Sequence, residues 1–276
     1  MKRQQQVLTM TILSLAGLCI SCSDLKKELP TETAAGAQIH GQGWKDTAST
    51  NFHGLAIQYA GWSMSSCKEG HGPDYKGGSS SSSCLTCHTK PGGPENCTVC
   101  HGGVNAAPPK DLAGNTSASS PGVGAHQSHL LGTGSIATPI ACNECHIVPA
   151  SLSAAGHIDS TAGAEVMFLV TPRYAAGQSF SQSALTCENT YCHGNFTNGN
   201  KKSVVWNDVS GQAGACGSCH GDATKSSIGD KALPKTSANG GTHPNNTQCV
   251  NCHSRVIDAN YKLTFSKHID GQIEFN

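Results

Sequence analysis

The chain has 276 residues, and its 18 basic and 18 acidic side chains give a formal net charge of zero at pH 7. Aromatic residues make up only 5% of it and charged residues 13%, whereas glycine alone contributes 32 residues. Such a chain has too few large apolar side chains to build a conventional core that offsets its conformational entropy. The charge balance gives no support to nucleic-acid binding, so we expect no nucleic-acid partner.

Residues 1–21 have the features of an export signal. Lys2 and Arg3 precede a mostly apolar run, residues 7–20, which is too short for a comfortable membrane span. Removal of the signal takes both basic residues away and leaves a formal charge of −2. We therefore expect an exported protein.

Cys22 is a candidate for lipidation. The small Ser21 before it resembles the lipobox of bacterial lipoproteins, in which the cysteine is acylated and becomes the new N-terminus. Cys19 stands at a position that leucine usually holds, so ordinary signal cleavage nearby is the alternative. Ser23 after the cysteine favours the outer membrane, by analogy with lipoprotein sorting in Gram-negative bacteria. The expected location is the periplasmic or the cell-surface side of that membrane.

Residues 22–83 form an N-terminal arm without a complete cysteine motif. The arm contains His40 and His53, and further on Cys67, which lies four residues before His71. Five serines, residues 79–83, follow as a flexible connector. The role of these histidines and of the cysteine depends on the motifs downstream.

Five C-x-x-C-H motifs and one widened motif follow the arm. C-x-x-C-H is the attachment signature of a c-type haem, in which two thiols form thioether bonds to the porphyrin and the adjacent histidine ligates iron. The six are Cys84-x-x-Cys87-His88, Cys97-x-x-Cys100-His101, Cys142-x-x-Cys145-His146, Cys187-x4-Cys192-His193, Cys216-x-x-Cys219-His220 and Cys249-x-x-Cys252-His253. Their repetition predicts six covalent haems c, which also supply the missing apolar surface.

The widened motif keeps the essential arrangement. Two extra residues separate Cys187 from Cys192, but Cys192 and His193 remain adjacent. The ligand is therefore still presented beside its thioether, and only the loop back to Cys187 must bulge. We expect a haem here as well.

The histidine count suggests two histidines for each iron. Of the 14 histidines, six lie in the complete motifs and one, His71, lies in the incomplete motif. The remaining seven are candidate distal ligands: His40, His53, His126, His129, His157, His243 and His268. A surface histidine is the ordinary interpretation of any one of them, but seven of each kind is the number that bis-histidine ligation of seven irons requires.

The incomplete motif Cys67-Lys-Glu-Gly70-His71 has glycine where the second thiol belongs. It predicts either a seventh haem, held by one thioether bond and by His71, or a site that has been lost. The balanced histidine count favours the seventh haem.

An internal repeat divides the remainder of the chain. In both copies a haem motif is followed by the sequence His-Ile-Asp, at residues 157–159 and 268–270. Each copy also contains two further haem motifs upstream of that point. We therefore expect two three-haem modules, residues 84–170 and 187–276.

The expected fold is mostly irregular and packed around haems, with few short helices and short strands. Single helical turns should form at the C-x-x-C-H motifs, and residues 166–170 and 204–206 should form short strands. The Gly- and Ser-rich segments, residues 111–135 and 221–242, should be irregular.

The motif pair at residues 187–220, with Trp206 between its two halves, resembles the repeated motif of the multihaem c-type cytochromes of metal-reducing bacteria. Many members of that family are outer-membrane lipoproteins. The resemblance extends from about residue 40 to the C-terminus, and the chain departs from it at Gly70. It implies electron transfer towards or across the cell surface, with other redox proteins or extracellular electron acceptors as partners and a lipid anchor in the membrane.

Three alternatives remain. A zinc protein uses cysteine and histidine ligands, and a disulfide scaffold uses paired cysteines, but neither explains a histidine directly after the second cysteine of each motif. The third alternative is a multihaem reductase of a small nitrogen or sulfur oxyanion, which requires an iron with an open coordination position. The histidine count argues against an open position, so we expect an electron carrier rather than an enzyme.

Overall fold

The computed structural model describes residues 39–103, 105, 110–132, 136–159, 161, 163–168 and 177–276. The chain divides into two compact units, Met1–Ser63 and Met64–Asn276. Their boundary lies inside the expected N-terminal arm. The division of the chain into an arm and two three-haem modules stays a prediction.

The first unit contains one helix, α2 (His53–Tyr59), among its described residues. The Nδ1 atom of His53 lies 2.8 Å from the carbonyl oxygen of Trp44, which fixes the imidazole at the start of the helix. The rings of His40 and Trp44 stack in parallel, with centroids 4.2 Å apart. Both histidines of this unit are therefore held by Trp44.

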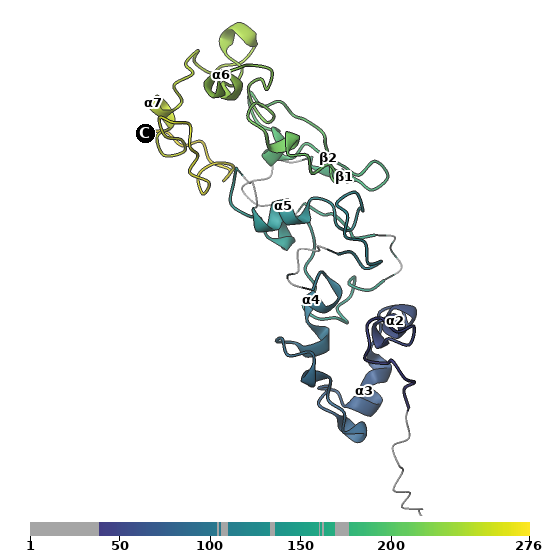
Figure 1. Ribbon diagram of the computed structural model, residues 1–276. Coiled ribbons are helices and arrows are strands. Elements are labelled where there is room, and N and C mark those ends of the chain that lie inside the picture. Colours follow the sequence, from purple (N-terminus) through teal and green to yellow (C-terminus); the bar gives the residue numbers. More distant parts are fainter. Residues whose placement is uncertain are drawn as a thin grey trace, which may run out of the picture. The chain divides into compact units, whose positions relative to one another are not determined.

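Short helices and helical turns connected by irregular segments make up most of the second unit (Figure 1). They are α3 (Ser65–His71), η1 (Gly78–Ser80), η2 (Cys84–Thr86), η3 (Gly93–Glu95), α4 (Cys97–Cys100), α5 (His126–Leu131), η4 (Cys142–Glu144), η5 (Tyr191–His193), η6 (Gln212–Gly214), α6 (Ile228–Ala232), η7 (Ser237–Asn239) and α7 (Val250–His253). Helical turns coincide with five of the six haem motifs, and the motif at Cys216 forms turns instead. The expected fold class is confirmed.

The described residues form one small antiparallel sheet in the order β1 (Ser179–Ser181), β2 (Thr186–Glu188) and β3 (Val204–Val205). Phe180 is opposite Cys187, and Cys187 is opposite Val204. The strand expected at residues 204–206 is thus confirmed in β3. The one expected at residues 166–170 is wrong for its described part, because residues 166–168 have no regular structure and use their backbone in a clamp described below.

Two helices lie in segments that were expected to be irregular. Helix α5 lies within residues 111–135 and is capped at its C-terminal end by Gly132, whose φ of 66° is a left-handed conformation that glycine adopts without strain. Helix α6 lies within residues 221–242 and is capped at its N-terminal end by Ser227, whose hydroxyl accepts a hydrogen bond from the Asp230 N–H at 3.0 Å.

The polypeptide by itself builds only a thin core. Among the described residues, the buried hydrophobic side chains are Met64, Tyr75, Val123, Ala125, Cys219 and Ile257, and no large side chain is less than 2% exposed. Conversely, Ile147 is 65% exposed and Phe275 61% exposed. The packing is therefore incomplete without further apolar groups, as the composition suggested.

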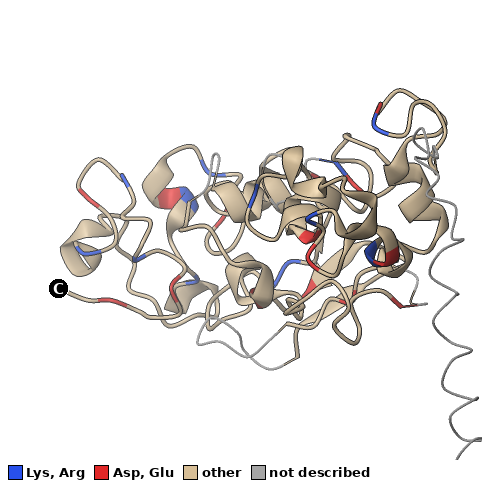
Figure 2. Ribbon diagram, turned by 90° about the horizontal axis from the view of Figure 1, so that it is seen from below, with Lys and Arg blue, Asp and Glu red and all other residues tan. Residues whose placement is uncertain are grey.

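None of the described helices has the length and apolarity to cross a membrane. Figure 2 shows that Lys and Arg residues and Asp and Glu residues are scattered among predominantly uncharged residues in the described part of the chain.

Candidate haem sites

Four of the regular motifs close the same helical turn. The histidine N–H donates to the carbonyl of the first cysteine over 3.0 Å at His88, and over 2.9 Å at His101, His146 and His253. Residues four apart in a helix lie on one face, so the first thiol and the imidazole point to the same side. All 13 described cysteines are free thiols. Both thiols of each motif are thus available to attach a porphyrin.

The widened motif reaches a similar arrangement with a strand and a turn. Cys187 lies in β2, and Cys192 and His193 lie in η5. Between them, Asn189 adopts a left-handed conformation with φ of 55°, which asparagine tolerates better than most residues. The side chain of Asn195 supports this turn by donating to the Asn189 carbonyl at 2.8 Å. The extra residues are absorbed here, as the sequence predicted.

The motif at Cys216 is held by a neighbouring loop instead of its own helix. The side-chain amide of Asn200 donates to the carbonyls of Gly217, Ser218 and Gly221, each at 3.1 Å. The Asn200 N–H donates to the carbonyl of Cys219 at 2.8 Å. This role of Asn200 was missed from the sequence, because asparagines in glycine-rich loops are common and these contacts span about twenty residues.

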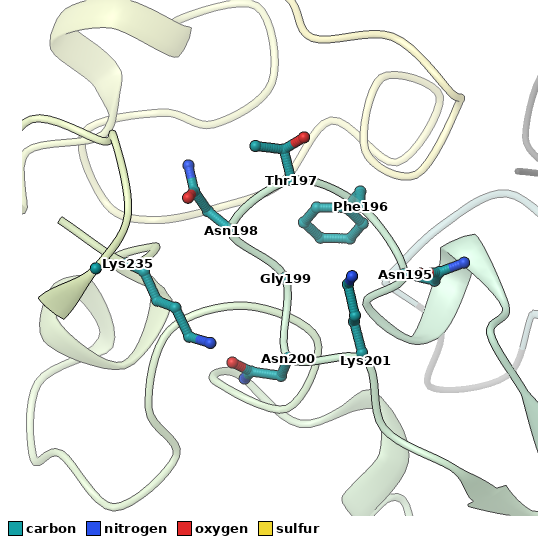
Figure 3. Close-up of a pocket in the computed structure, with 9 residues that line it drawn as sticks. Asn195, Phe196, Thr197, Asn198, Gly199, Asn200, Lys201 and Lys235 are labelled. Carbon is teal, nitrogen blue, oxygen red and sulfur yellow. The ribbon is translucent and has the colours of Figure 1, made fainter. Parts of the chain in front are cut away.

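The same loop, residues 195–201, lines an open groove of about 550 Å³, with Lys235 on the opposite side (Figure 3). The ring of Phe196 in this loop lies 6.2 Å from that of His220. The groove therefore borders the motif at Cys216, and Lys201 and Lys235 make it positively charged.

Most of the histidines share one orientation. In at least ten of the 14, all of which lie in the described part of the chain, the Nδ1 atom lies within 3.0 Å of a backbone carbonyl oxygen: His53, His71, His126, His129, His146, His157, His220, His243, His253 and His268. A carbonyl at Nδ1 fixes the tautomer with its proton there and leaves Nε2 as the ligand atom. Metal-binding histidines usually have such a partner.

Five of the motif histidines each face one of the candidate distal histidines. The ring centroids are 6.1 Å apart for His101 and His157, 6.3 Å for His146 and His126, 6.2 Å for His193 and His129, 6.4 Å for His220 and His268, and 6.4 Å for His253 and His243. The narrow range indicates a common separation of the two rings in all five pairs.

This spacing fits one iron between the two rings. A metal–imidazole bond is about 2 Å long and the ligand nitrogen lies about 1 Å from the ring centre, so two coaxial ligands place the centroids about 6 Å apart. The described residues do not gather three or more His, Cys, Asp or Glu side chains around a point where they could hold a metal ion alone. The donor set is therefore two imidazoles beside two thiols, which is what a bis-histidine haem c requires.

Burial keeps several of these imidazoles neutral, as ligation requires. It lowers the pKa of His193 to about 4. Burial is also the main cause of lowered pKa values at His101, His126, His220 and His268.

A repeated backbone clamp holds two of the motif histidines. The Nδ1 atom of His146 lies 2.7 Å from the carbonyl oxygen of Glu165, and the N–H of Met167 donates to the carbonyl of Cys145. The second copy has the same arrangement, with His253 and Glu274 at 2.7 Å and Asn276 donating to Cys252. Residues 164–168 therefore act as a clamp rather than as a strand.

The motifs at Cys97, Cys142, Cys187 and Cys216 neighbour one another in sequence order. The pKa of His101 is lowered by burial and then by His157 and His146, and the pKa of Cys145 is raised to about 12 by burial and then by Cys187. The thiol of Cys219 donates to the carbonyl of Cys192 at 3.2 Å. Each of these interactions connects one motif with the next.

The remaining candidate ligands lie at the N-terminal end of the described chain. His71 ends α3, and its Nδ1 atom lies 2.7 Å from the carbonyl oxygen of Ser82 and 2.9 Å from the Ser80 hydroxyl. His40 and His53 belong to the first unit, and the arrangement of the two units relative to each other is not described. Cys22 and residues 1–21 lie outside the described residues.

The sequence did not predict which histidines pair. Only a comparison of the two copies could have suggested the pairing. In both copies the histidine of the His-Ile-Asp sequence, His157 or His268, skips the motif directly before it and faces the next one upstream. His126 and His243 each face the motif that follows them. His129 has no counterpart in the second copy. It lies in the first copy but faces His193, the histidine of the widened motif.

Comparison with known families identifies a short matching segment. Residues 186–220 match the family model described as the Geobacter CxxxxCH...CXXCH motif. The matched segment contains the widened motif, Trp206 and the motif at Cys216, and its cysteines and histidines indicate covalently bound haem c of a multihaem c-type cytochrome. No curated protein and no solved structure matches the chain.

Proposed function

We propose that this chain is a multihaem c-type cytochrome that transfers electrons through haems ligated by histidine pairs. The observation that carries the proposal is the set of five His–His pairs with centroids 6.1 to 6.4 Å apart, each containing one motif histidine. A haem held at each of these pairs would supply a one-electron Fe(III)/Fe(II) couple.

The polypeptide contributes spacing and orientation. The helical turns present the thiols and the proximal imidazole on one side, and the carbonyls at Nδ1 hold the ligand planes in place. The order of the sites along the chain supports electron passage between successive motifs. The oxyanion-reductase alternative needs an open coordination position, and two facing imidazoles at a site leave none there.

We place this electron transfer at the outer membrane, on either the periplasmic or the cell-surface side, in respiration that ends on an extracellular acceptor such as a metal. The support is the signal-like N-terminus with Cys22 and the resemblance of the motif pair. Other redox proteins would donate or accept the electrons.

The mature wild-type protein should carry at least six haems that acid-acetone extraction does not remove. Thioether bonds survive this treatment, whereas non-covalent haem is extracted. A pyridine haemochrome assay against protein concentration measures the number. A count well below six would overturn the proposal.

Replacing Cys22 by alanine should release the protein from the membrane fraction into the soluble fraction. The expected cause is the loss of the acyl chains that anchor the N-terminus. Haem staining of the separated fractions measures the partition, and Cys19→Leu serves as a control that keeps Ser21 and Cys22. Unchanged partitioning of Cys22→Ala would favour ordinary signal cleavage.

A further inference from the structure

One short helix carries ligands for two different sites. His126 and His129 lie three residues apart in α5, so they share a face of the helix. His126 faces His146, which belongs to the first expected module, and His129 faces His193, which belongs to the second. The position of α5 therefore controls the distal side of two neighbouring sites.

Trp206 contacts both of these histidines. Its indole lies edge-on to the ring of His126, with centroids 4.7 Å apart, and 5.8 Å from that of His129 at an interplanar angle of 27°. Aromatic pairs at these separations attract each other.

Trp206 is itself anchored by hydrogen bonds of its indole and of its backbone. Its Nε1–H donates to the carbonyl of Pro121 at 2.8 Å, and the Trp206 backbone N–H donates to the carbonyl of Leu185 at 2.7 Å. The adjacent Asn207 side chain donates to the carbonyl of Ser119 at 2.9 Å. Trp206 thus links the strand that carries Cys187 to the loop that leads into α5.

Gly124 makes room for this contact. A Cβ atom at Gly124 would lie 2.1 Å from Nε1 of Trp206, far inside van der Waals contact. The backbone of Gly124 also has a φ of 43°, which disfavours other residues. The chain therefore leaves space for the indole directly before the helix that bears the two histidines.

We propose that Trp206 is a positioning residue that sets α5 so that His126 and His129 complete the axial pairs at His146 and His193. The inference rests on the proposed function, because it concerns the haems bound at these sites. On this proposal, α5 and Trp206 connect the two expected modules, because they hold the distal ligand of one site in each, the site of His146 and the site of His193.

Trp206→Ala should convert the haems at His146 and His193 partly to the high-spin state and leave the other haems low-spin. The physical reason is that α5 loses its support and both distal imidazoles move away from their irons. Ferric optical and EPR spectra of the purified holoprotein measure the high-spin fraction. Val205→Ala is the control directly before Trp206 in the chain, because the Val205 side chain is 48% exposed.

A double-mutant cycle separates positioning from general stability. In a His126→Ala, His129→Ala background both sites are already high-spin, so Trp206→Ala should add no further high-spin haem. If the high-spin signal spreads to other haems in this background, Trp206 is merely structural and the inference is wrong. The inference is also wrong if Trp206→Ala keeps every haem low-spin.

Gly124→Ala gives an independent test that keeps the indole. The added methyl group should displace Trp206 and reproduce the same two high-spin haems. Gly114→Ala is the matched control, since Gly114 also has a positive φ, 89°, but a Cβ there meets nothing within 4 Å. Equal spectra for these two variants would contradict the inference. A wild-type protein without covalent haem would instead overturn the proposed function.

Discussion

Replacing His268 by alanine should produce one high-spin haem, and the affected haem should be the one attached at Cys216 and Cys219. The ring of His268 lies 6.4 Å from that of His220, whereas the motif nearest to it in sequence ends at His253. Alanine removes the distal imidazole and leaves an open position. The ferric spectrum of the purified variant should therefore show a high-spin component equal to one haem.

His243→Ala is the matched control, because His243 faces His253 at the same 6.4 Å. It should also give one high-spin haem, but the low-spin EPR signal that disappears should be different. The ring planes of His220 and His268 lie at 70°, and those of His243 and His253 at 22°. Nearly perpendicular ligand planes give a strongly anisotropic low-spin EPR signal and nearly parallel planes a rhombic one. His268→Ala should therefore remove an anisotropic signal and His243→Ala a rhombic one, and the opposite assignment would refute the pairing.

Local features of these sites follow from the sequence, and the pairing does not. Four of the five C-x-x-C-H motifs form their own helical turn, in which the histidine N–H bonds to the carbonyl of the first cysteine four residues earlier, and the motif at Cys216 is the exception. The orientation of His268 instead depends on the carbonyl of Ile136, at 2.8 Å and 132 residues away in the chain. No local pattern encodes such a contact.

The helix α5 illustrates the same limit. Its surroundings in the sequence, rich in Gly and Ser, predict an irregular segment, and a helix of six residues is too short to be stable alone. Tertiary contacts with Trp206 override this local preference. The expected strand at residues 166–170 failed for a related reason, since the Met167 N–H bonds to Cys145 rather than to a neighbouring strand.

The thin core was predictable from composition. With 5% aromatic residues the chain cannot fill its own interior, and the described residues indeed bury few apolar side chains. Haem faces would cover apolar groups such as Ile147 and Phe275. Folding of the chain and attachment of haem are therefore expected to depend on each other.

The incomplete motif at Cys67 retains the geometry of a haem site. Cys67 and His71 lie four residues apart in α3, and His71 ends its helix as His253 ends α7. The Nδ1 atom of His71 is 2.7 Å from a carbonyl oxygen, the same distance as in His253. A Cβ atom at Gly70 would meet nothing within 4 Å, so the position of the missing thiol is open.

Neighbouring contacts hold α3 in place beside the next motif. The hydroxyl of Tyr75 donates to Glu95 at 2.6 Å, and Lys68 of α3 pairs with the same carboxylate at 3.0 Å. Burial, and next the nearby Cys67, raise the pKa of the Cys84 thiol. The incomplete motif is therefore adjacent to the first complete motif, at Cys84, as expected for a further haem site that precedes it in the chain.

We expect the wild-type protein to carry a seventh haem here, with a single thioether bond to Cys67 and with His71 as ligand. Gly70→Cys should keep the count at seven and move the reduced absorption band of this haem to shorter wavelength, into line with the others. The physical reason is that the second thiol saturates a vinyl group that otherwise extends the conjugation of the porphyrin. Pyridine haemochrome spectra and the intact mass measure the two quantities.

Gly70→Ala is the control for this change, because it fills the same open position without adding a thiol, so its band should stay where the wild type has it. Cys67→Ser removes the thioether and should lower the covalent count from seven to six. These outcomes require that haem is attached at Cys67 in the wild type. If the wild-type mass corresponds to six haems and Cys67 is freely alkylated, the motif is a lost site, and α3 keeps its shape through protein contacts such as those of Lys68 with Glu95 and of His71 with Ser82.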